Sequence, residues 1–167
     1  MIKTTNLEGF TIRPAIESDA SLVLRFIRQL ADYERLSHEV EANEEMIEKA
    51  LFGPRPYAEV VIGEYRSEPV GFALFFYNFS TFVGKPGIHL EDLFIIPEMR
   101  GRGYGTTMLQ YLARLAVDRD CGRLEWAVLD WNEPAIKVYE SIGARLMKEW
   151  IINRLSGNEL SELASKF

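Results

Sequence analysis

Arg100-Gly101-Arg102-Gly103-Tyr104-Gly105 lies between an apolar stretch and an amphipathic stretch. The residues before it, 93 to 96, predict a strand that ends at Pro97, and residues 106 to 117 repeat apolar side chains at helical spacing. Three glycines and two arginines therefore occupy a strand-to-helix turn. Glycine lets backbone N–H groups approach a ligand closely, and a helix start offers unpaired N–H donors with partial positive charge. Such a turn is suited to phosphate oxygens, to which arginines add bidentate contacts.

The glycine spacing excludes two other phosphate-binding loops. The stretch lacks the Lys-Ser/Thr ending of a nucleoside-triphosphate loop, and its glycines alternate instead of following G-x-G-x-x-G. What remains is Arg-x-x-Gly-x-Gly, read as Arg100, Gly103 and Gly105. The alternative explanation of this stretch alone is a tight turn with solvated arginines.

A second motif follows downstream. Residues 123 to 129 read as a strand, and a helix with Pro134 near its first turn then runs to Ser141. From Trp131 to Ala144 the chain reads Trp-Asn-x-x-Ala-x-x-x-Tyr-x-x-x-Gly-Ala. Together with the glycine-rich turn, this series resembles the GNAT superfamily, the acetyl-CoA-dependent N-acetyltransferases.

Four further segments narrow the resemblance. Residues 30 to 34 (Leu-Ala-Asp-Tyr-Glu), 89 to 94, 100 to 105 and 128 to 132 look like the spermidine/spermine N-acetyltransferase branch. Within that branch, residues 79 to 82 and 128 to 132 look more like the members that acetylate thialysine, a lysine analogue. The similarity extends from about Phe10 to Leu155, is weaker from Arg145 onward, and lacks the glycine-tryptophan turn of some relatives.

The resemblance implies an α/β GNAT fold in a single acetyltransferase domain over residues 1–167. Its sheet would be single, mixed, largely antiparallel and twisted, with six or seven strands splayed at its centre and about four flanking helices. The pattern of apolar residues predicts strands at 11–13, 58–64, 69–77, 88–96, 123–129 and 147–155. It predicts helices at 19–33, from about Asn43, after Gly105, at 135–141 and in the tail from 157 to 167.

Composition restricts the function further. The chain has 167 residues and a net charge of −6, which argues against nucleic acid and suits a cationic substrate. No apolar run is long enough to span a bilayer, so we expect no membrane partner. Cys121 is the one cysteine and agrees with a reducing cytoplasm. Two histidines, His38 and His89, are too few for a zinc site, so we expect no metal.

The resemblance also assigns the acetyl-CoA site. Backbone groups of one strand would bind the pantetheine arm, a bulge there would splay two strands, and the freed N–H would polarise the thioester carbonyl. Asn132 would bond the same arm, although capping its own helix is its ordinary role. The expected acetyl-CoA-binding residues are Leu93, Ile95, Arg100, Gly101, Arg102, Gly103, Tyr104, Gly105, Thr106, Asn132 and Tyr139.

Two carboxylates are candidates for the amine side. Glu91 lies in the central strand and, by alternation, would share a face with Leu93 and Ile95, which leaves Asp92 on the opposite face as a structural residue. Glu34 ends the first helix. The alternatives are an ion pair with an arginine for Glu91 and a solvated helix end for Glu34. The resemblance raises both glutamates as catalytic and substrate-binding residues.

Aromatic side chains complete the expected amine site. Phe82 and Trp131, with Phe79, are candidates to line the alkyl portion of the amine, and core packing is the alternative for each.

Tyr139 is the candidate that supports the leaving thiolate, because the resemblance points it at the CoA sulfur. A thiol has a pKa of ~8.5 and tyrosine ~10, so a strengthening hydrogen bond is as plausible as full proton donation. The alternative is a core tyrosine at helical spacing.

The chain is thus expected to acetylate a primary amine of a small cationic substrate of the thialysine, diamine or polyamine class. Direct attack of the amine on the thioester is the expected route. Rival functions are a protein N-terminal or lysine acetyltransferase and a catalytically silent acyl-CoA-binding module. The sequence leaves open which amine is used and whether Glu91 or Glu34 takes the proton. A homodimer is implied by the family alone.

Overall fold

A six-stranded sheet forms the centre of the first compact unit in the computed structural model, which describes residues 2–167. The first unit extends to Ala127 and the second is Val128–Phe167, and each is described by itself. Neighbouring strands follow the chain order and are antiparallel except the last pair, β5 and β6, which is parallel. A mixed, largely antiparallel sheet is therefore confirmed. The strands are β1 (Lys3–Thr4), β2 (Phe10–Pro14), β3 (Glu59–Tyr65), β4 (Glu68–Ser80), β5 (Lys85–Ile95) and β6 (Leu124–Trp126).

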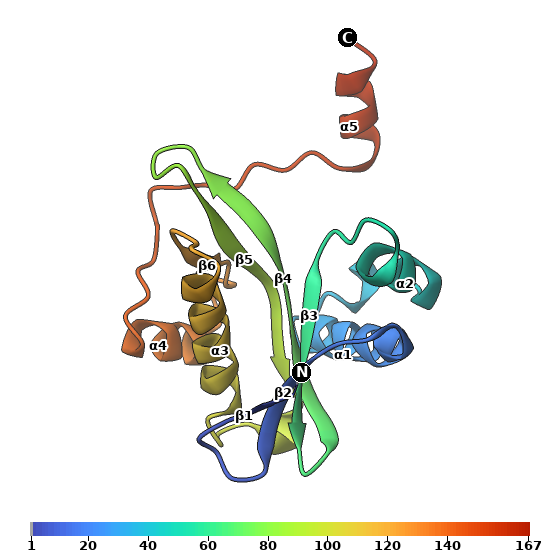
Figure 1. Ribbon diagram of the computed structural model, residues 1–167. Coiled ribbons are helices and arrows are strands. Elements are labelled where there is room, and N and C mark those ends of the chain that lie inside the picture. The colour runs from blue at the N-terminus through green and yellow to red at the C-terminus, as the bar shows by residue number, and fades with distance from the viewer. Residues whose placement is uncertain (1) are drawn as a thin grey trace. The chain divides into compact units, whose positions relative to one another are not determined.

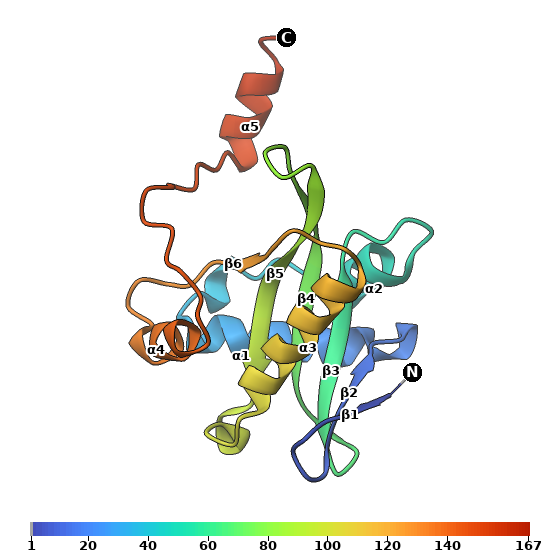
Figure 2. The same ribbon diagram turned by 60° about the vertical axis from the view of Figure 1, so that its left-hand side comes forward.

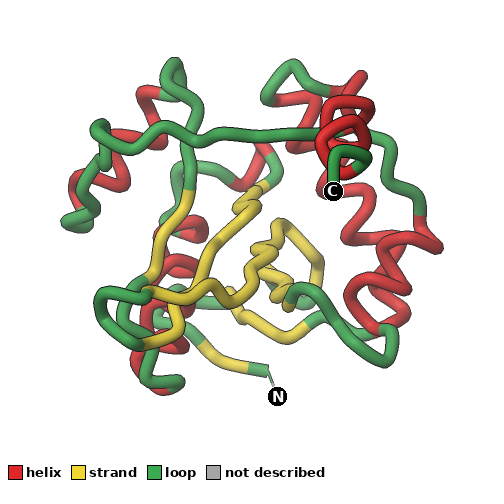
Figure 3. The backbone as a smooth tube through the Cα atoms, turned by 90° about the horizontal axis from the view of Figure 1, so that it is seen from above, coloured by secondary structure: helices red, strands yellow, loops and turns green. Residues whose placement is uncertain are grey.

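Helices cover both faces of this sheet. Helices α1 (Ala20–Tyr33) and α2 (Glu44–Phe52) lie on one face and α3 (Tyr104–Asp118) on the other (Figures 1 and 2). The view from above shows the strands in yellow and the helices in red (Figure 3). Short 3-10 turns complete the first unit: η1 (Glu17–Asp19), η2 (Ser37–Glu39) and η3 (Pro97–Met99).

Apolar side chains fill the space between the sheet and the helices on each face. On the α3 side, the ring of Phe10 stacks on Tyr104 at 4.2 Å between centroids, beside the buried Met108 and Leu112. On the α1 side, the core cluster is Val23, Phe26, Leu51, Val60, Ile62, Phe72 and Phe94. The two packed faces hold the central strands, among them β5, on which the predicted site residues Glu91, Leu93 and Ile95 lie.

A β-bulge interrupts β5 at Glu91. Leu74 of β4 pairs with Asp92 and the next residue, Phe75, pairs with Leu90, so Glu91 is the extra residue. Along the described strands, β6 pairs with β5 only from Ile88 to Leu90. The predicted bulge is therefore present, at Glu91, and the described pairing of β5 with β6 ends just before it. For the same reason β6 ends at Trp126 and is shorter than the predicted strand 123–129.

The second unit contains α4 (Glu133–Ser141) and α5 (Gly157–Ala164), as the helical patterns predict. The predicted strand at 147–155 is wrong, because the structure assigns no strand among these described residues. Trp150, Ile151 and Ile152 are exposed by 71, 83 and 75%. An alternating apolar run becomes a strand only where another strand supplies hydrogen-bond partners, and a local pattern does not specify that partner.

Candidate active site

The glycine-rich turn joins the end of β5 to the start of α3. Gly101 and Gly103 have φ angles of +74° and +83°, which side chains other than glycine rarely adopt. A Cβ at Gly101 would meet nothing within 4 Å, and one at Gly103 would meet only Leu7 at 3.6 Å. The space around both glycines is therefore open to a ligand. Gly103 also caps α3 without a side chain, which leaves the first-turn N–H groups for an anion.

The side chain of Tyr104 belongs to the core, because it is buried and stacked on Phe10. Its predicted contact with acetyl-CoA is therefore limited to its backbone N–H. Thr106 follows in the first turn of α3, where the positive end of the helix dipole lies.

Arg100 fixes the turn to the sheet. Its Nε donates a hydrogen bond to the backbone oxygen of Ile95 at 2.8 Å. Its guanidinium also lies over the ring of Tyr33 at 4.4 Å and near that of Phe94 at 5.3 Å. Arg100 thus joins the turn, the end of β5 and the end of α1, and its predicted phosphate contact is left to the remaining guanidinium N–H groups.

Glu34 is held at the C-terminal end of α1 by the backbone that follows it. Arg35 adopts a left-handed φ of 64°, and the N–H of Leu36 donates to the oxygen of Ala31 at 2.7 Å. This is the usual geometry by which a helix ends. Ser37 further donates to the carboxylate of Asp32 at 3.2 Å, which ties the following segment to the helix.

Three carboxylates gather on the α1 face of the sheet. Burial, together with the charges of Glu91 and Glu34, raises the pKa of Asp92 to about 6. Burial also raises the pKa of Glu34. Three like charges at one place are unfavourable without a counter-ion, so the cluster provides a strong site for an ammonium group.

The bulge affects the predicted orientation of the two acidic residues in β5. Asp92 pairs with Leu74, which packs on the α1 core cluster, whereas Leu93 pairs with Ala73. Residues directly opposite in a sheet share a face, so Asp92 and not Leu93 lies toward α1. The prediction that Asp92 lies on the face opposite Leu93 is thus confirmed. The bulge interrupts the alternation at Glu91, so a shared face of Glu91 with Leu93 and a structural role of Asp92 stay predictions.

Asp92 is therefore the site residue that sequence reasoning missed. The signal in the sequence was the adjacent pair Glu91 and Asp92 within an apolar strand. Strict alternation places one of the two on each face of the sheet, so one of them must face the packed side. His89 was also missed, and its Nε2 lies 3.7 Å from a carboxylate oxygen of Glu91.

Asn132, Tyr139 and Trp131 lie in the second unit. The side chain of Asn132 accepts a hydrogen bond from the N–H of Ala135 at 3.4 Å and so caps α4, its ordinary role. Tyr139 lies within α4, and Trp131 is 47% exposed just before it. Because each unit is described by itself, the approach of these residues to acetyl-CoA stays a prediction.

Phe82 lies on the turn between β4 and β5 and is 96% exposed. Six residues of β5 separate the start of that strand from Glu91, a span of about 20 Å at ~3.3 Å per residue. The turn thus stands far from the three carboxylates within the same unit. Its part in lining the amine stays a prediction.

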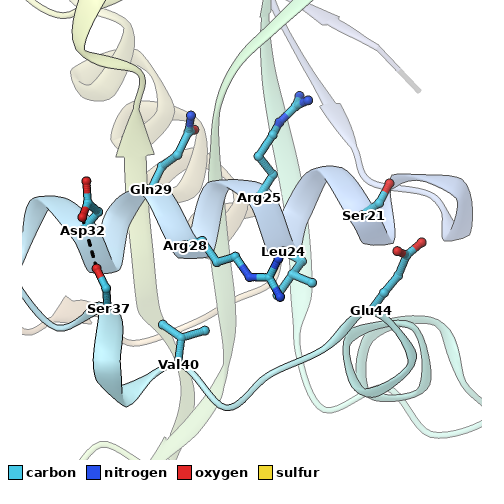
Figure 4. A pocket seen from close by; sticks show the side chains of 9 residues that line it. All are labelled: Ser21, Leu24, Arg25, Arg28, Gln29, Asp32, Ser37, Val40 and Glu44. Carbon is cyan, nitrogen blue, oxygen red and sulfur yellow. Dashed lines mark hydrogen bonds between the residues drawn. The ribbon is translucent and has the colours of Figure 1, made fainter.

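An open pocket lies on the outer surface of α1, between this helix and the segment that leads into α2 (Figure 4). Arg25 and Arg28 line it together with Asp32 and Glu44, so charges of both signs surround it. None of the predicted site residues lines this pocket. Ser37 and Asp32 also line this pocket, and the hydrogen bond between them is drawn in Figure 4.

Two searches of residues 2–167 concern other kinds of site. No group of three or more His, Cys, Asp or Glu side chains that could hold a metal ion was found among them. No helix in the described part of the chain is long and apolar enough to cross a membrane.

The mixed sheet, the glycine-rich turn and the bulge in β5 are the features expected of an acyltransferase of the GNAT type. A model of the Acetyltransferase (GNAT) family matches residues 24–144 of the chain. The chain therefore belongs to the GNAT acetyltransferase family, and it is an N-acetyltransferase.

Known proteins are similar to this chain along nearly its full length. A thialysine N-epsilon-acetyltransferase of Bos taurus is 38% identical over 166 residues, covering 93% of this chain and 97% of the relative. An L-ornithine N5-acetyltransferase of Arabidopsis thaliana is 30% identical over 197 residues, covering 91% and 86% respectively. Among solved structures, an integron cassette protein of V. cholerae has a TM-score of 0.78 at 26% identity, covering 93% of this chain and 98% of that one. The similarity to thialysine acetyltransferases predicted from residues 79–82 and 128–132 is thus confirmed.

Proposed function

We propose that this acetyltransferase transfers the acetyl group of acetyl-CoA to a primary amine of a small cationic substrate of the thialysine, diamine or polyamine class. The observation that carries the proposal is the cluster of Glu34, Glu91 and Asp92 on the α1 face. A substrate with two ammonium groups can place one among the carboxylates after the other has lost its proton. The names of the relatives, which act on thialysine and on ornithine, support the same class.

The carboxylates would bind the substrate and also accept its proton. An alkylammonium has a pKa of ~10.4, so removing its proton at neutral pH costs about 4 kcal/mol. Asp92, with its pKa raised to about 6, accepts a proton more readily than an ordinary carboxylate, and Glu91 beside it is half-exposed to water. The neutral amine then attacks the thioester carbon, the C–S bond breaks, and the thiolate leaves with support from Tyr139.

Acetyl-CoA would be held by groups whose arrangement fits a pyrophosphate and a pantetheine arm. The open space at Gly101 and Gly103 and the uncapped first turn of α3 support the pyrophosphate contact. The stretch of β5 beyond Leu90, which β6 does not pair, supports backbone contacts from Leu93 and Ile95. Arg102, Gly105, Thr106 and Asn132 complete the proposed set.

We further propose that residues 1–167 act as a single acetyltransferase domain. The match of the family model from residue 24 to 144 runs through the boundary at Ala127 and supports this. A cytoplasmic location is supported by the single free cysteine, Cys121. A homodimer is proposed from the family resemblance.

A panel of amines tests the proposed function through the release of free CoA. Thialysine, ornithine and 1,3-diaminopropane should have higher kcat/KM values than aromatic amines. The matched pair is 1,3-diaminopropane and propylamine, which differ by the second amino group. Equal kcat/KM values for that pair would contradict the role of the second cation, and no CoA release with any amine would contradict the proposed function itself.

A further inference from the structure

Three neighbouring strands each carry a polar side chain near the bulge: Asn78 on β4, His89 on β5 and Glu125 on β6. His89 of β5 pairs with Phe76 on one side and with Glu125 of β6 on the other, so all three share the α1 face. The ring of His89 contacts Phe76 at 5.0 Å between centroids, which limits its movement toward β4. His89 thereby takes a fixed place between the bulge and the edge strand.

The imidazole of His89 lies between two carboxylates. Its Nε2 is 3.7 Å from Oε2 of Glu91, and its Nδ1 is 3.9 Å from Oε1 of Glu125. The side chain of His89 is 27% exposed, whereas Glu91 and Glu125 are 53 and 43% exposed. Each ring nitrogen therefore lies nearest to a different carboxylate, and both carboxylates are partly exposed to solvent.

Glu125 is itself held in place. Asn78 of β4 donates to its Oε1 at 2.6 Å, and Nε of Arg123 lies 3.1 Å from its Oε2. The charged groups that surround His89 are thus Glu91 on its own strand, Glu125 on β6 and Arg123 just before β6. Asp92 shares the face beyond the bulge and faces Glu34 of α1.

We propose that His89 is a positioning residue that relays the proton of the amine from Glu91, which the bound amine would cover, to Glu125 and so to solvent. The inference rests on the proposed function, in which Glu91 takes part in accepting that proton. A proton cannot remain on the carboxylate cluster, because the next turnover needs the carboxylate again. Imidazole changes its charge near neutral pH and can bind a proton at either nitrogen, which suits it to pass a proton between two oxygens.

The O–H bond of protonated Glu91 breaks and an N–H bond forms at Nε2, while the N–H bond at Nδ1 breaks and an O–H bond forms on Glu125. Glu125 then releases the proton to water, and exchange with solvent returns the proton of His89 to Nδ1. The recorded distances exceed a hydrogen bond, so each step needs a closer approach or one bridging water. Such contacts commonly tighten when substrate binds.

The pH dependence of His89→Gln tests the relay. Glutamine keeps a polar side chain of similar reach but does not titrate. We expect kcat/KM for a diamine to fall about 10-fold near neutral pH, less than the ~10²–10⁴-fold contribution of a direct acid–base group. The loss should disappear as the pH approaches ~10.4, where the amine loses its proton unaided. The affinity for acetyl-CoA should be unchanged, and so should the activity of the control His38→Gln, because His38 lies on η2 next to Glu39.

Two further variants separate a relay from a structural role. Glu125→Gln should lower the same neutral-pH rate, and combining it with His89→Gln should cost less than the product of the single losses, because both act on one path. Added imidazole should raise the rate of His89→Ala. A loss that is equal at all pH values, no loss, or no rescue by imidazole would each overturn the relay. If the wild-type protein acetylates none of the amines, the proposed function fails instead.

Discussion

Arg100 lies over the ring of Tyr33, with 4.4 Å between its Cζ and the ring centroid. Tyr33 is the last residue of α1 and precedes Glu34, whereas Arg100 opens the glycine-rich turn. One contact therefore joins the proposed cofactor loop to the helix end that carries a proposed amine-binding carboxylate. The proposed cofactor turn and the proposed amine-binding end of α1 are thus held together by the contact between Arg100 and Tyr33.

Arg100→Lys should weaken acetyl-CoA binding by about 10-fold, equivalent to ~1.4 kcal/mol. Lysine keeps the charge but has no planar guanidinium. It cannot donate a hydrogen bond to Ile95 and stack on the ring of Tyr33 at the same time. Isothermal titration calorimetry measures the change. The control is Arg114→Lys on α3, where Arg114 pairs with Asp118 one turn away and no loop contact is altered. Equal affinities for the wild type and Arg100→Lys would contradict the supporting role.

Gly103→Asn should block acetyl-CoA binding while the protein stays folded. Asparagine tolerates a positive φ better than other side chains, but its Cβ and amide occupy the open space above the turn. The more severe Gly103→Val should also destabilise the fold. Gly84→Asn is the matched control, since Gly84 has a φ of +70° and a Cβ there would meet nothing within 4 Å, yet it lies on the β4–β5 turn. Unchanged calorimetric affinity of Gly103→Asn would remove the turn from the cofactor site.

Asp92 should make the folding stability depend on pH in a defined direction. Its pKa rises from 3.8 to about 6 on folding, so the folded protein binds this proton more tightly than the unfolded chain. The contribution of Asp92 to the free energy of unfolding is therefore fully present below pH 3.8 and is lost as the pH rises through about 6. Asp92→Asn should remove this dependence and stabilise the protein at pH 7 by up to about 3 kcal/mol.

Urea denaturation at several pH values measures this change. The control is Glu98→Gln on the exposed turn η3, which should leave the profile unchanged. Asp92→Asn should at the same time raise the KM for diamines, because the cluster loses one negative charge. An unaltered pH profile of stability would contradict the burial of this carboxyl.

Tyr139→Phe should lower kcat with little change in acetyl-CoA affinity. The lost hydroxyl would strengthen its hydrogen bond only as the sulfur gains charge, so its contribution belongs to the transition state. Loss of a general acid costs ~10²–10⁴-fold, and loss of one hydrogen bond costs less. Single-turnover kinetics with acetyl-CoA measures the chemical step directly. A wild-type rate in that step would show that another group supports the leaving thiolate.

The sequence by itself determined the family, most of the helices and strands up to residue 141, and the position of the glycine-rich turn. Those features depend on local rules: glycine at positive φ in residues 101 and 103, helical spacing after Gly105, and the residue series from Trp131 to Ala144. Asn43 and Asn132 likewise cap their helices through side chains that act within one turn. Each of these signals acts over a few residues, so a linear sequence contains it in full.

Only the tertiary structure decided which carboxylates lie together. A single extra residue at Glu91 interrupts the alternation of β5, and this bulge depends on the pairing of β4 with β5. The apolar run at 147–155 failed as a strand for the same reason, because pairing is a property of two segments. Glu34, His89, Asp92 and Glu125 come from different parts of the chain, and strand register with helix packing determines their distances and the raised pKa of Asp92.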